Sequence, residues 1–440
     1  MKASPARAKT RLVGDGRLLR NVMTMLSGTT LAQVITVAAM VPLARLYSPT
    51  DFGFFTIAQS LVTVGTAFAA LRYDVAIVLP EREADARVLH RLASRLIAVV
   101  STIMAVVLLL VSHLVNDHYQ HETFGLWLAV AAVIVYSMAQ IMNIQNWLIR
   151  RSNFGPIAQN KVLASILMVT TQLIMAPLIG GFEGLLLGML LGQILALAVL
   201  YGRTTSLREP IPADAPTMRN MANRYKKMPM LNAPNVIVDA IRDAGINVLI
   251  GNIAMGSLGQ FSLANRATNA PVYLIRGAIA QVFLPMMARA EPGQLVPLLK
   301  KLLLRIGVIS VPAFALFYWI APTLFVLLFG PAWTEAGLFA QALVPWLFLN
   351  TFTSPLANVY ITAEKQEWLL GFAVVYAAAP LTFLALSTLP LMVTVHVLAW
   401  IMSALLLCMV GMTMMIARRF DRGVTAPRPG GTSAGPEADT

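Results

Sequence analysis

Cysteine is almost absent from this 440-residue chain, and charged residues are scarce. The one cysteine, Cys408, excludes an intramolecular disulfide and a cysteine-based metal cluster. Charged residues make up 12% of the chain against 58% hydrophobic residues, and the mean hydropathy is +0.71. That composition leaves too little polar surface to enclose a soluble globule of this length. The sequence therefore predicts an integral membrane protein, and we expect no cofactor and no metal.

Apolar runs recur from about residue 21 to about residue 417, each near the roughly 20 residues that a helix needs to cross a bilayer. We predict an all-α polytopic membrane protein with about twelve transmembrane helices, in two six-helix lobes around a central cleft. The expected spans are 21–45, 54–79, 96–115, 124–149, 156–179, 184–202, 232–255, 258–287, 300–320, 336–361, 368–388 and 390–416. The domain boundaries follow as a basic cytoplasmic tail (1–20), an N-lobe (21–202), a cytoplasmic linker (203–231), a C-lobe (232–417) and a disordered cytoplasmic tail (418–440).

Positive charge is distributed unevenly between the two sets of connections. All but five of the 33 Lys and Arg residues lie in alternate connections or in the tails. Because positively charged loops stay cytoplasmic, both termini are predicted on the cytoplasmic side of a cell inner membrane. The formal net charge of +13 is thus spread over one membrane face. This favours anionic membrane lipids as partners and argues against nucleic acid.

Five arginines lie within or beside the apolar runs, and they need a separate explanation. A charge at the centre of a bilayer costs about 2.5 to 3.5 kcal/mol, so it must face water, a partner or a ligand. The five are Arg45, Arg72, Arg242, Arg266 and Arg276. We expect Arg45 to form a local ion pair with Asp51 across a short turn. The other four are candidates for ligand binding.

Polar residues line one face of two predicted spans. In the span 258–287, they fall within an arc of about 100° on a helical wheel. Asp239, Arg242 and Asp243 lie close together in the span 232–255. Guanidinium groups suit a phosphate-bearing ligand, because they stay charged and can donate two parallel hydrogen bonds. The predicted substrate-binding residues are Arg72, Arg242, Arg266, Arg276, Asn265, Asn269 and Tyr273.

The acidic residues of these spans have two possible roles. Asp74, Asp239 and Asp243 could bind a coupling proton or Na⁺. Alternatively, Arg72 pairs with Asp74 or another acid, and Arg242 with Asp239 or Asp243, so that these residues only hold helices together. No catalytic residue or metal-ligand set is predicted.

The two halves of the chain share a short repeat. Residues 51–59, DFGFFTIAQ, resemble residues 257–265, SLGQFSLAN, at an offset of 206 residues. Six spans separate the two segments, and six is an even number, so both halves would enter the membrane from the same side. This predicts parallel repeats related by an axis along the membrane normal.

Several motifs, in order along the chain, resemble those of bacterial O-antigen and exopolysaccharide flippases of the multidrug, oligosaccharidyl-lipid and polysaccharide exporter superfamily. They are PLARLYSPTDFG at 42–53, Arg72-Tyr73-Asp74, YKKMP at 225–229, QVFLP at 281–285 and FGPAWTEAG at 329–337. The resemblance implies two lobes with alternating access, and a substrate of undecaprenyl-diphosphate-linked oligosaccharide that is moved to the periplasmic leaflet. It implies diphosphate or acidic-sugar contact for Arg72 above all, with a glycan polymerase and chain-length machinery as partners. The charges at Asp239, Arg242 and Asp243 depart from the family pattern.

Three other functions remain open on the sequence alone. A multidrug or other ion-coupled exporter of the same superfamily would share the fold. A flippase for lipid-linked peptidoglycan precursors would share the substrate chemistry. A membrane glycosyl polymerase or ligase would also hold a lipid diphosphate, but the short outer loops leave no room for an acceptor domain, so we expect a protein that is not an enzyme.

Overall fold

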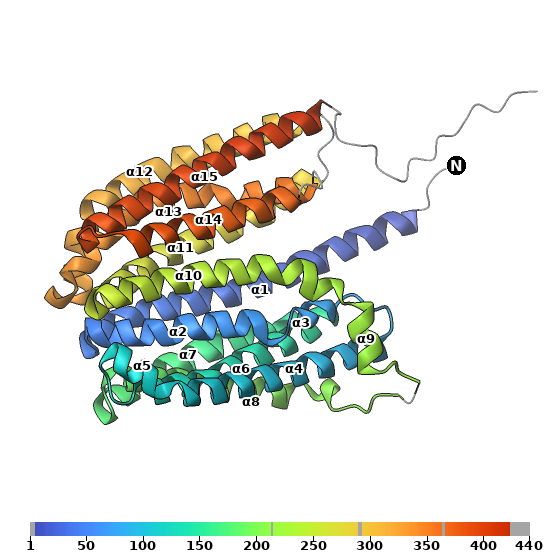
Figure 1. Cartoon of the computed structure of the whole chain (residues 1–440). Helices are drawn as coiled ribbons and strands as arrows, with labels where there is room; N and C mark the ends of the chain where they lie inside the picture. Colours follow the sequence, from blue (N-terminus) through green and yellow to red (C-terminus); the bar gives the residue numbers. More distant parts are fainter. Residues whose placement is uncertain (1–4, 213, 289–292, 363–365, 423–440) are drawn as a thin grey trace, which may run out of the picture.

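The computed structural model describes residues 5–212, 214–288, 293–362 and 366–422, and within these ranges it is all-helical, without a strand. Figure 1 shows the arrangement of the helices. The α-helices are α1 (Pro5–Leu46), α2 (Pro49–Ala69), α3 (Tyr73–Ala76), α4 (Glu83–Leu110), α5 (Ser112–Tyr119), α6 (Phe124–Arg150), α7 (Phe154–Leu178), α8 (Gly181–Arg203), α9 (Met218–Arg224), α10 (Ala233–Ile253), α11 (Met255–Ala288), α12 (Leu295–Phe329), α13 (Thr334–Thr362), α14 (Gln366–Leu386) and α15 (Leu391–Asp421). Three short turns of 3-10 or π type join them: η1 (Thr205–Leu207), η2 (Met228–Asn232) and η3 (Pro331–Trp333).

Ten helical segments in the described ranges are long and apolar enough to cross a membrane. They come from α1, α2, α4, α6, α7, α8, α12, α13, α14 and α15, so the chain is a multi-pass membrane protein. The two remaining predicted spans, 232–255 and 258–287, correspond to α10 and α11. Both form long helices, and α10 carries three charged residues, Asp239, Arg242 and Asp243, within its 21 residues. Their polar faces are turned toward the interior of the protein, as described below.

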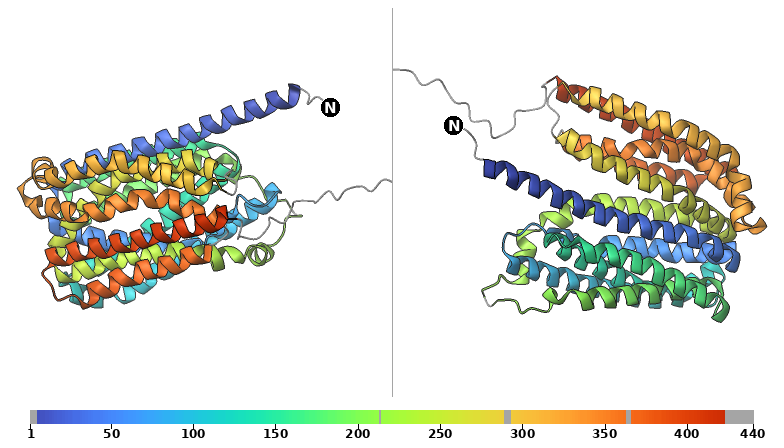
Figure 2. Two further views of the ribbon diagram at one scale, coloured as in Figure 1. Left: turned by 90° about the horizontal axis from the view of Figure 1, so that it is seen from above. Right: turned by 180° about the vertical axis from the view of Figure 1, so that it is seen from behind.

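The helices form two lobes that meet along α2. In the first lobe, α7 packs against α1 and α8, and α6 packs against α2, α4 and α8. In the second, α13 packs against α11, α12 and α15, and α10 packs against α14. The lobes are joined chiefly by α2, which contacts both α10 and α11. Figures 1 and 2 show the first lobe in blue to green and the second in yellow-green (α10) to red. The predicted two-lobe fold is confirmed.

The segments of the predicted repeat face one another where α2 crosses α11. Thr56 Oγ1 donates a hydrogen bond of 2.7 Å to Ser262 Oγ, and these residues are 206 positions apart. Gly53 and Gly259 allow the two backbones to lie close together. A Cβ added at Gly53 would overlap the Met255 carbonyl oxygen, and one added at Gly259 would overlap the Pro49 carbonyl oxygen. These two contacts are also related by the 206-residue offset. Such reciprocal contacts are expected at an axis that relates two parallel repeats.

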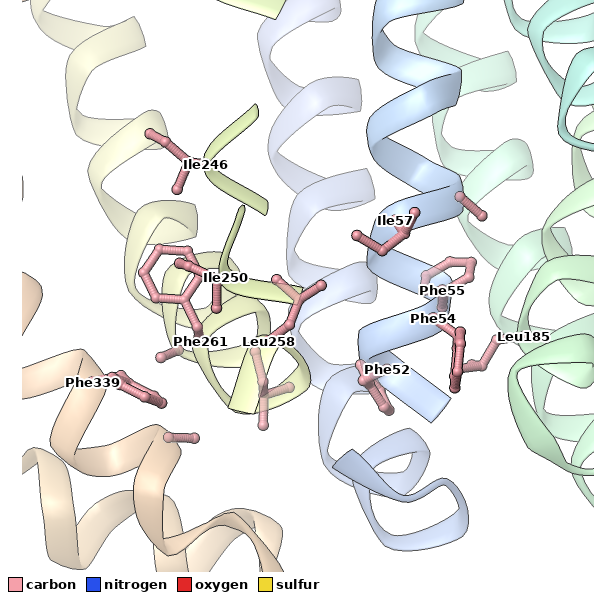
Figure 3. Packing of buried hydrophobic residues seen from close by; sticks show 14 of the residues in the cluster. Phe52, Phe54, Phe55, Ile57, Leu185, Ile246, Ile250, Leu258, Phe261 and Phe339 are labelled. Carbon is pink, nitrogen blue, oxygen red and sulfur yellow. The ribbon is translucent and has the colours of Figure 1, made fainter. Parts of the chain in front are cut away.

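Apolar and aromatic side chains close the lobes together at this end of the molecule. Figure 3 shows side chains from α2, α8, α10, α11 and α13 that belong to one buried cluster here. Trp333, fully buried, stacks edge-on with Phe52 at 5.1 Å, and its Nε1 donates a hydrogen bond of 2.7 Å to the Ala44 carbonyl oxygen. The lobes therefore share a continuous core at the end that carries the α1–α2 and α10–α11 turns.

The predicted ion pair between Arg45 and Asp51 is wrong. Asp51 Oδ2 accepts hydrogen bonds from the Ser48 backbone N–H at 2.8 Å and from Ser48 Oγ at 2.7 Å, which completes a capping box at the start of α2. Arg45 Nη2 reaches instead to the Leu328 carbonyl oxygen, at 3.3 Å in the second lobe. The first N–H groups of a helix have no partner within the helix, and a capping side chain supplies one. An ion pair with Arg45 would leave these N–H groups without a partner.

The opposite end of the molecule carries the N-terminal end of α1, the linker and the end of α15 (Figure 1). Helix α1 begins at Pro5, within the predicted basic tail 1–20, and α15 runs to Asp421, within the predicted tail 418–440. Residues 1–4 and 423–440 lie outside the described residues. The linker folds over the end of α4, where the nearly buried Arg87 pairs with Glu83 at 3.0 Å and with Glu209 at 2.7 Å. The division of the chain into an N-lobe at 21–202 and a C-lobe at 232–417 stays a prediction.

Candidate functional site

Four adjoining pockets form a cavity that runs from inside the second lobe to the interface between the lobes, and we call it the central cavity. The largest pocket, of about 640 Å³, is lined by α10, α11, α13, α14 and α15. Pockets of about 350, 370 and 150 Å³ extend it along α2 toward the first lobe. Three residues from three helices each line three of the four pockets, namely Gln59, Asp243 and Arg266. They mark the centre of the cavity.

Arg266 is a cation without an acidic partner in the described part of the chain. Its Nη2 donates a hydrogen bond of 3.2 Å to Thr56 Oγ1, and its guanidinium lies 5.4 Å from the centre of the Phe55 ring. No ion pair involves this residue among the described side chains. Because α2 holds one edge of the guanidinium, the remaining N–H groups are available to an anion in the cavity. Arg266 thus has the geometry of an anion-binding group.

Arg242 lies in the same cavity but is held between two carboxylates. Its Nη1 is 2.8 Å from Asp239 Oδ1, and its Nη2 is 2.8 Å from Asp243 Oδ1. The guanidinium also lies over the Tyr376 ring at 4.9 Å, and Tyr376 Oη accepts a hydrogen bond of 2.7 Å from Trp346 Nε1. The side chains of Asp239 and Asp243 are 56% and 59% exposed, whereas that of Arg242 is 12% exposed. This group, the Arg242 cluster, carries a net charge of −1, so Arg242 is already neutralised.

We expect Arg242→Met to lower the free energy of unfolding by about 1 to 3 kcal/mol, because two like charges would be left beside one another without their cation. The triple variant Asp239→Asn, Arg242→Met, Asp243→Asn removes the repulsion and should recover most of that loss. Equilibrium unfolding in mixed micelles measures both. A triple variant as unstable as Arg242→Met would show that repulsion between the two carboxylates does not cause the loss of stability.

Arg72 lines the 350 Å³ pocket of the central cavity, just beyond the end of α2. The prediction of one continuous helix over 54–79 is wrong. Helix α2 ends at Ala69, and only the single turn of α3 follows. The break comes from two residues in the left-handed region, Leu71 with φ 46° and Arg72 with φ 63°. The 21 residues of α2 already span about 31 Å, enough to cross the hydrocarbon layer.

The alternative role for Arg72, an ion pair with Asp74 or another acid, is not seen among the described ion pairs. Asp74 is buried and accepts a hydrogen bond of 3.1 Å from Asn146 Nδ2, while Arg72 Nε is buried without a hydrogen-bond partner. Both residues line the 350 Å³ pocket, which they share with Asp239 and Asp243. The structure therefore brings Arg72 and the Arg242 cluster to one compartment.

The remaining predicted site residues belong to α11. Asn265 and Asn269 line the largest pocket, and Asn269 Nδ2 donates a hydrogen bond of 3.0 Å to the Asn265 carbonyl oxygen. Tyr273 and Arg276 also belong to α11, but their side chains lie outside the part of the chain that the structure describes. The polar stripe therefore faces the cavity as far as Asn269.

Gln59 and Tyr376 are among the cavity residues that were not predicted from the sequence. Gln59 occupies the repeat position equivalent to Asn265, at the 206-residue offset, and both line the 150 Å³ pocket. The repeat was thus a usable signal for Gln59. Tyr376 lies in an apolar stretch of α14, and no sequence pattern marks it as the residue beneath Arg242.

Comparisons with known proteins identify the family. A family model described as "Polysaccharide biosynthesis protein" matches residues 42–337. No curated protein sequence matches the chain. Among solved structures, the lipid II flippase MurJ in an inward closed conformation aligns with a TM-score of 0.69 and 14% identity over 90% of each chain.

Two transporters show the same architecture. A multidrug resistance MATE family transporter of the MOP superfamily, inward-facing, aligns with a TM-score of 0.60 and 15% identity over 90% of this chain and 96% of the other. A MATE transporter of Vibrio cholerae aligns with a TM-score of 0.60 and 10% identity over 93% and 97%. At these identities the structures show the shared fold alone. The family match covers most of the chain in sequence, and the chain therefore belongs to the polysaccharide biosynthesis protein family, as its motifs predicted.

Proposed function

We propose that this protein is a flippase that moves an undecaprenyl-diphosphate-linked oligosaccharide from the cytoplasmic to the periplasmic leaflet, for O-antigen or exopolysaccharide biosynthesis. The observation that carries the proposal is Arg266, a cation in the central cavity whose guanidinium has no acidic partner among the described residues. A diphosphate is the anion that such a group suits best. Membership of the polysaccharide biosynthesis protein family supports a glycan as the rest of the substrate.

The proposed cycle is alternating access by the two lobes, 21–202 and 232–417. The contacts at Gly53, Gly259 and Trp333 close one end of the cavity. The opposite end carries the basic connections, so we assign it to the cytoplasm of a cell with an inner membrane, with both termini there. In the state described, the substrate head would enter between the lobes from the cytoplasmic side. Separation of α2 from α11 would then release it outward.

The other polar residues of the cavity have proposed roles beside Arg266. Arg72, in the 350 Å³ pocket, would meet the diphosphate, and Asn265 and Asn269 would bind sugar hydroxyl groups. Tyr273 and Arg276 would extend the same binding face. Asp74, Asp239 and Asp243 are the proposed sites for a coupling proton or Na⁺, since their carboxylates line the cavity. A glycan polymerase and chain-length machinery would take over the product.

Export of a cationic compound is the second candidate, favoured by the net negative charge of the Arg242 cluster. Proteoliposomes separate the two. Purified protein should expose a fluorescent undecaprenyl-diphosphate oligosaccharide of the inner leaflet to a membrane-impermeant quencher, at least tenfold faster than empty liposomes. The same vesicles should not transport a cationic dye. Dye transport without lipid flipping would overturn the proposal. Recovery of the glycan unchanged after the assay would distinguish flipping from polymerisation or ligation, which would alter the glycan.

A further inference from the structure

The 640 Å³ pocket of the central cavity combines three kinds of side chain within the second lobe. Its lining holds five asparagines from α10, α11 and α13, two carboxylates from α10, and aromatic rings that include Trp346 and Phe372. A sugar carries hydroxyl groups around its edge and C–H groups on its faces. Polar groups that form hydrogen bonds beside aromatic rings therefore suit a sugar as the occupant of this pocket.

Three hydrogen-bond acceptors of α10 belong to residues that line this pocket and have no partner in the described part of the chain. Arg242 bonds to Oδ1 of Asp239 and of Asp243, and no hydrogen bond reaches Oδ2 of either residue among the described side chains. Asn235 Oδ1 is buried and also has no partner there. Residues 235, 239 and 243 are four positions apart, so the acceptors follow one face of α10 over about 12 Å. A ligand that lies along this face must supply hydrogen-bond donors.

Arg242 holds the two carboxylates in place without cancelling their charge. Its guanidinium lies 2.8 Å from Oδ1 of each aspartate and rests over the Tyr376 ring. That ring is itself held, because Tyr376 Oη accepts a hydrogen bond of 2.7 Å from Trp346 Nε1 and the Phe372 ring stacks on it with centroids 5.4 Å apart. The two Oδ2 atoms are thus preorganised acceptors, which bind a donor at a small cost in side-chain ordering.

Positive and negative charge are separated across the central cavity. Arg266 is the one charged residue among the described residues that line the 370 Å³ pocket, which is formed by α1, α2, α7, α8 and α11. The 350 Å³ pocket is lined instead by three acids, Asp74, Asp239 and Asp243, against the single cation Arg72. A carboxylate of a ligand beside α10 would meet like charge and would offer no donor to the aspartates. An anion is therefore favoured on the Arg266 side and disfavoured beside α10.

We propose that the 640 Å³ pocket is a sugar subsite that selects an amino sugar, whose ammonium group contacts Asp239 and Asp243, and rejects an acidic sugar. The inference rests on the proposed function and adds to it the class of glycan. The diphosphate lies on the Arg266 side, and the sugar beside α10 carries a positive charge or, with weaker binding, no charge. Asp239 and Asp243 then contact sugar rather than a coupling ion, and Arg242 is a positioning residue.

The direct test compares three undecaprenyl-diphosphate disaccharides that are built from glucosamine, from N-acetylglucosamine or from N-acetylglucosaminuronic acid. Binding to the purified protein is measured in mixed micelles by microscale thermophoresis. The amino sugar should bind at least about tenfold more tightly than the uronic acid, with the neutral sugar between them. Equal affinities, or tightest binding of the uronic acid, would overturn the proposal.

Variants of the two aspartates distinguish sugar selection from a structural or ion-coupling role. Asp239→Asn brings the Arg242 cluster to zero net charge and keeps the pair of Arg242 with Asp243, so the preference for the amino sugar should fall to about twofold or less. Asp239→Asn combined with Asp243→Asn gives the cluster a charge of +1 and should reverse the preference. The ratio of affinities is compared within each variant, so a loss of folded protein does not change it. An equal loss for all three sugars in Asp239→Asn would contradict the proposal.

Asp117→Asn is the charge-matched control. The Asp117 side chain is 65% exposed on α5, and this residue lines none of the four cavity pockets. It should keep the wild-type preference. A change in preference as large as that of Asp239→Asn would show that the effect comes from the overall charge of the protein and not from the pocket.

Flipping of the same three lipids is measured in proteoliposomes, so the two proposals can fail separately. Selective binding without flipping overturns the proposed function and leaves the sugar subsite standing. Flipping with equal affinity for all three sugars overturns the subsite alone.

Discussion

Replacing Arg266 with alanine is expected to slow flipping of the lipid-linked oligosaccharide by about 100-fold. A bidentate, charge-assisted contact to a diphosphate contributes about 2 to 3 kcal/mol, which corresponds to that factor. Arg266→Lys keeps the charge but loses the planar fork, so its loss should be about tenfold. Rates are measured in proteoliposomes that contain equal amounts of folded protein.

The folded state should tolerate the Arg266→Ala change. Arg266 has no acidic partner in the described residues, so its removal leaves no unpaired carboxylate, and Thr56 keeps its hydrogen bond to Ser262. Arg91→Ala is the charge-matched control, since Arg91 is exposed on α4 and lines none of the four cavity pockets. It should flip substrate at the wild-type rate. Wild-type flipping by Arg266→Ala would remove the main support for the proposed function.

Gly259→Ala is expected to abolish the closed contact between α2 and α11 and to reduce flipping at least tenfold. The new methyl group would overlap the Pro49 carbonyl oxygen, which is backbone and cannot rotate away. The two helices must then separate at the end that we assign to the periplasm. A transporter that cannot close this end cannot complete an alternating cycle.

The opening can be measured with a single cysteine. In a Cys408→Ser background, Ser60→Cys places a thiol on the 150 Å³ pocket, where Ser60 is 5% exposed. A membrane-impermeant thiol reagent added from the periplasmic side should label it in Gly259→Ala and not in the parent. Gly256→Ala is the control three residues away, because its nearest atom, Thr50 Oγ1, would be 3.5 Å from the new Cβ. Labelling in both variants, or in neither, would contradict the role of the Gly259 contact.

Much of the candidate site could be predicted because it repeats at helical spacing. The residues of α10 and α11 that face the cavity are three and four positions apart, and this periodicity is visible in the sequence. Arg242 could be expected between Asp239 and Asp243 for the same reason, and it is bound there. Arg72 and Asp74 show the limit of that argument. After a break in the helix both residues line the same pocket without forming an ion pair, and Asp74 accepts a hydrogen bond from Asn146 of α6 instead.

The sequence by itself determined the class of the protein, the ends of most helices, the uneven distribution of positive charge and the polar faces of α10 and α11. These properties depend on hydropathy and on spacing along one chain, so they can be read from neighbours in sequence. The tertiary structure alone decided which distant groups meet. Thr56 contacts Ser262, and Arg266 is left without an acid among the described residues. Such contacts depend on how two lobes pack around an axis, and packing is a property of the whole fold.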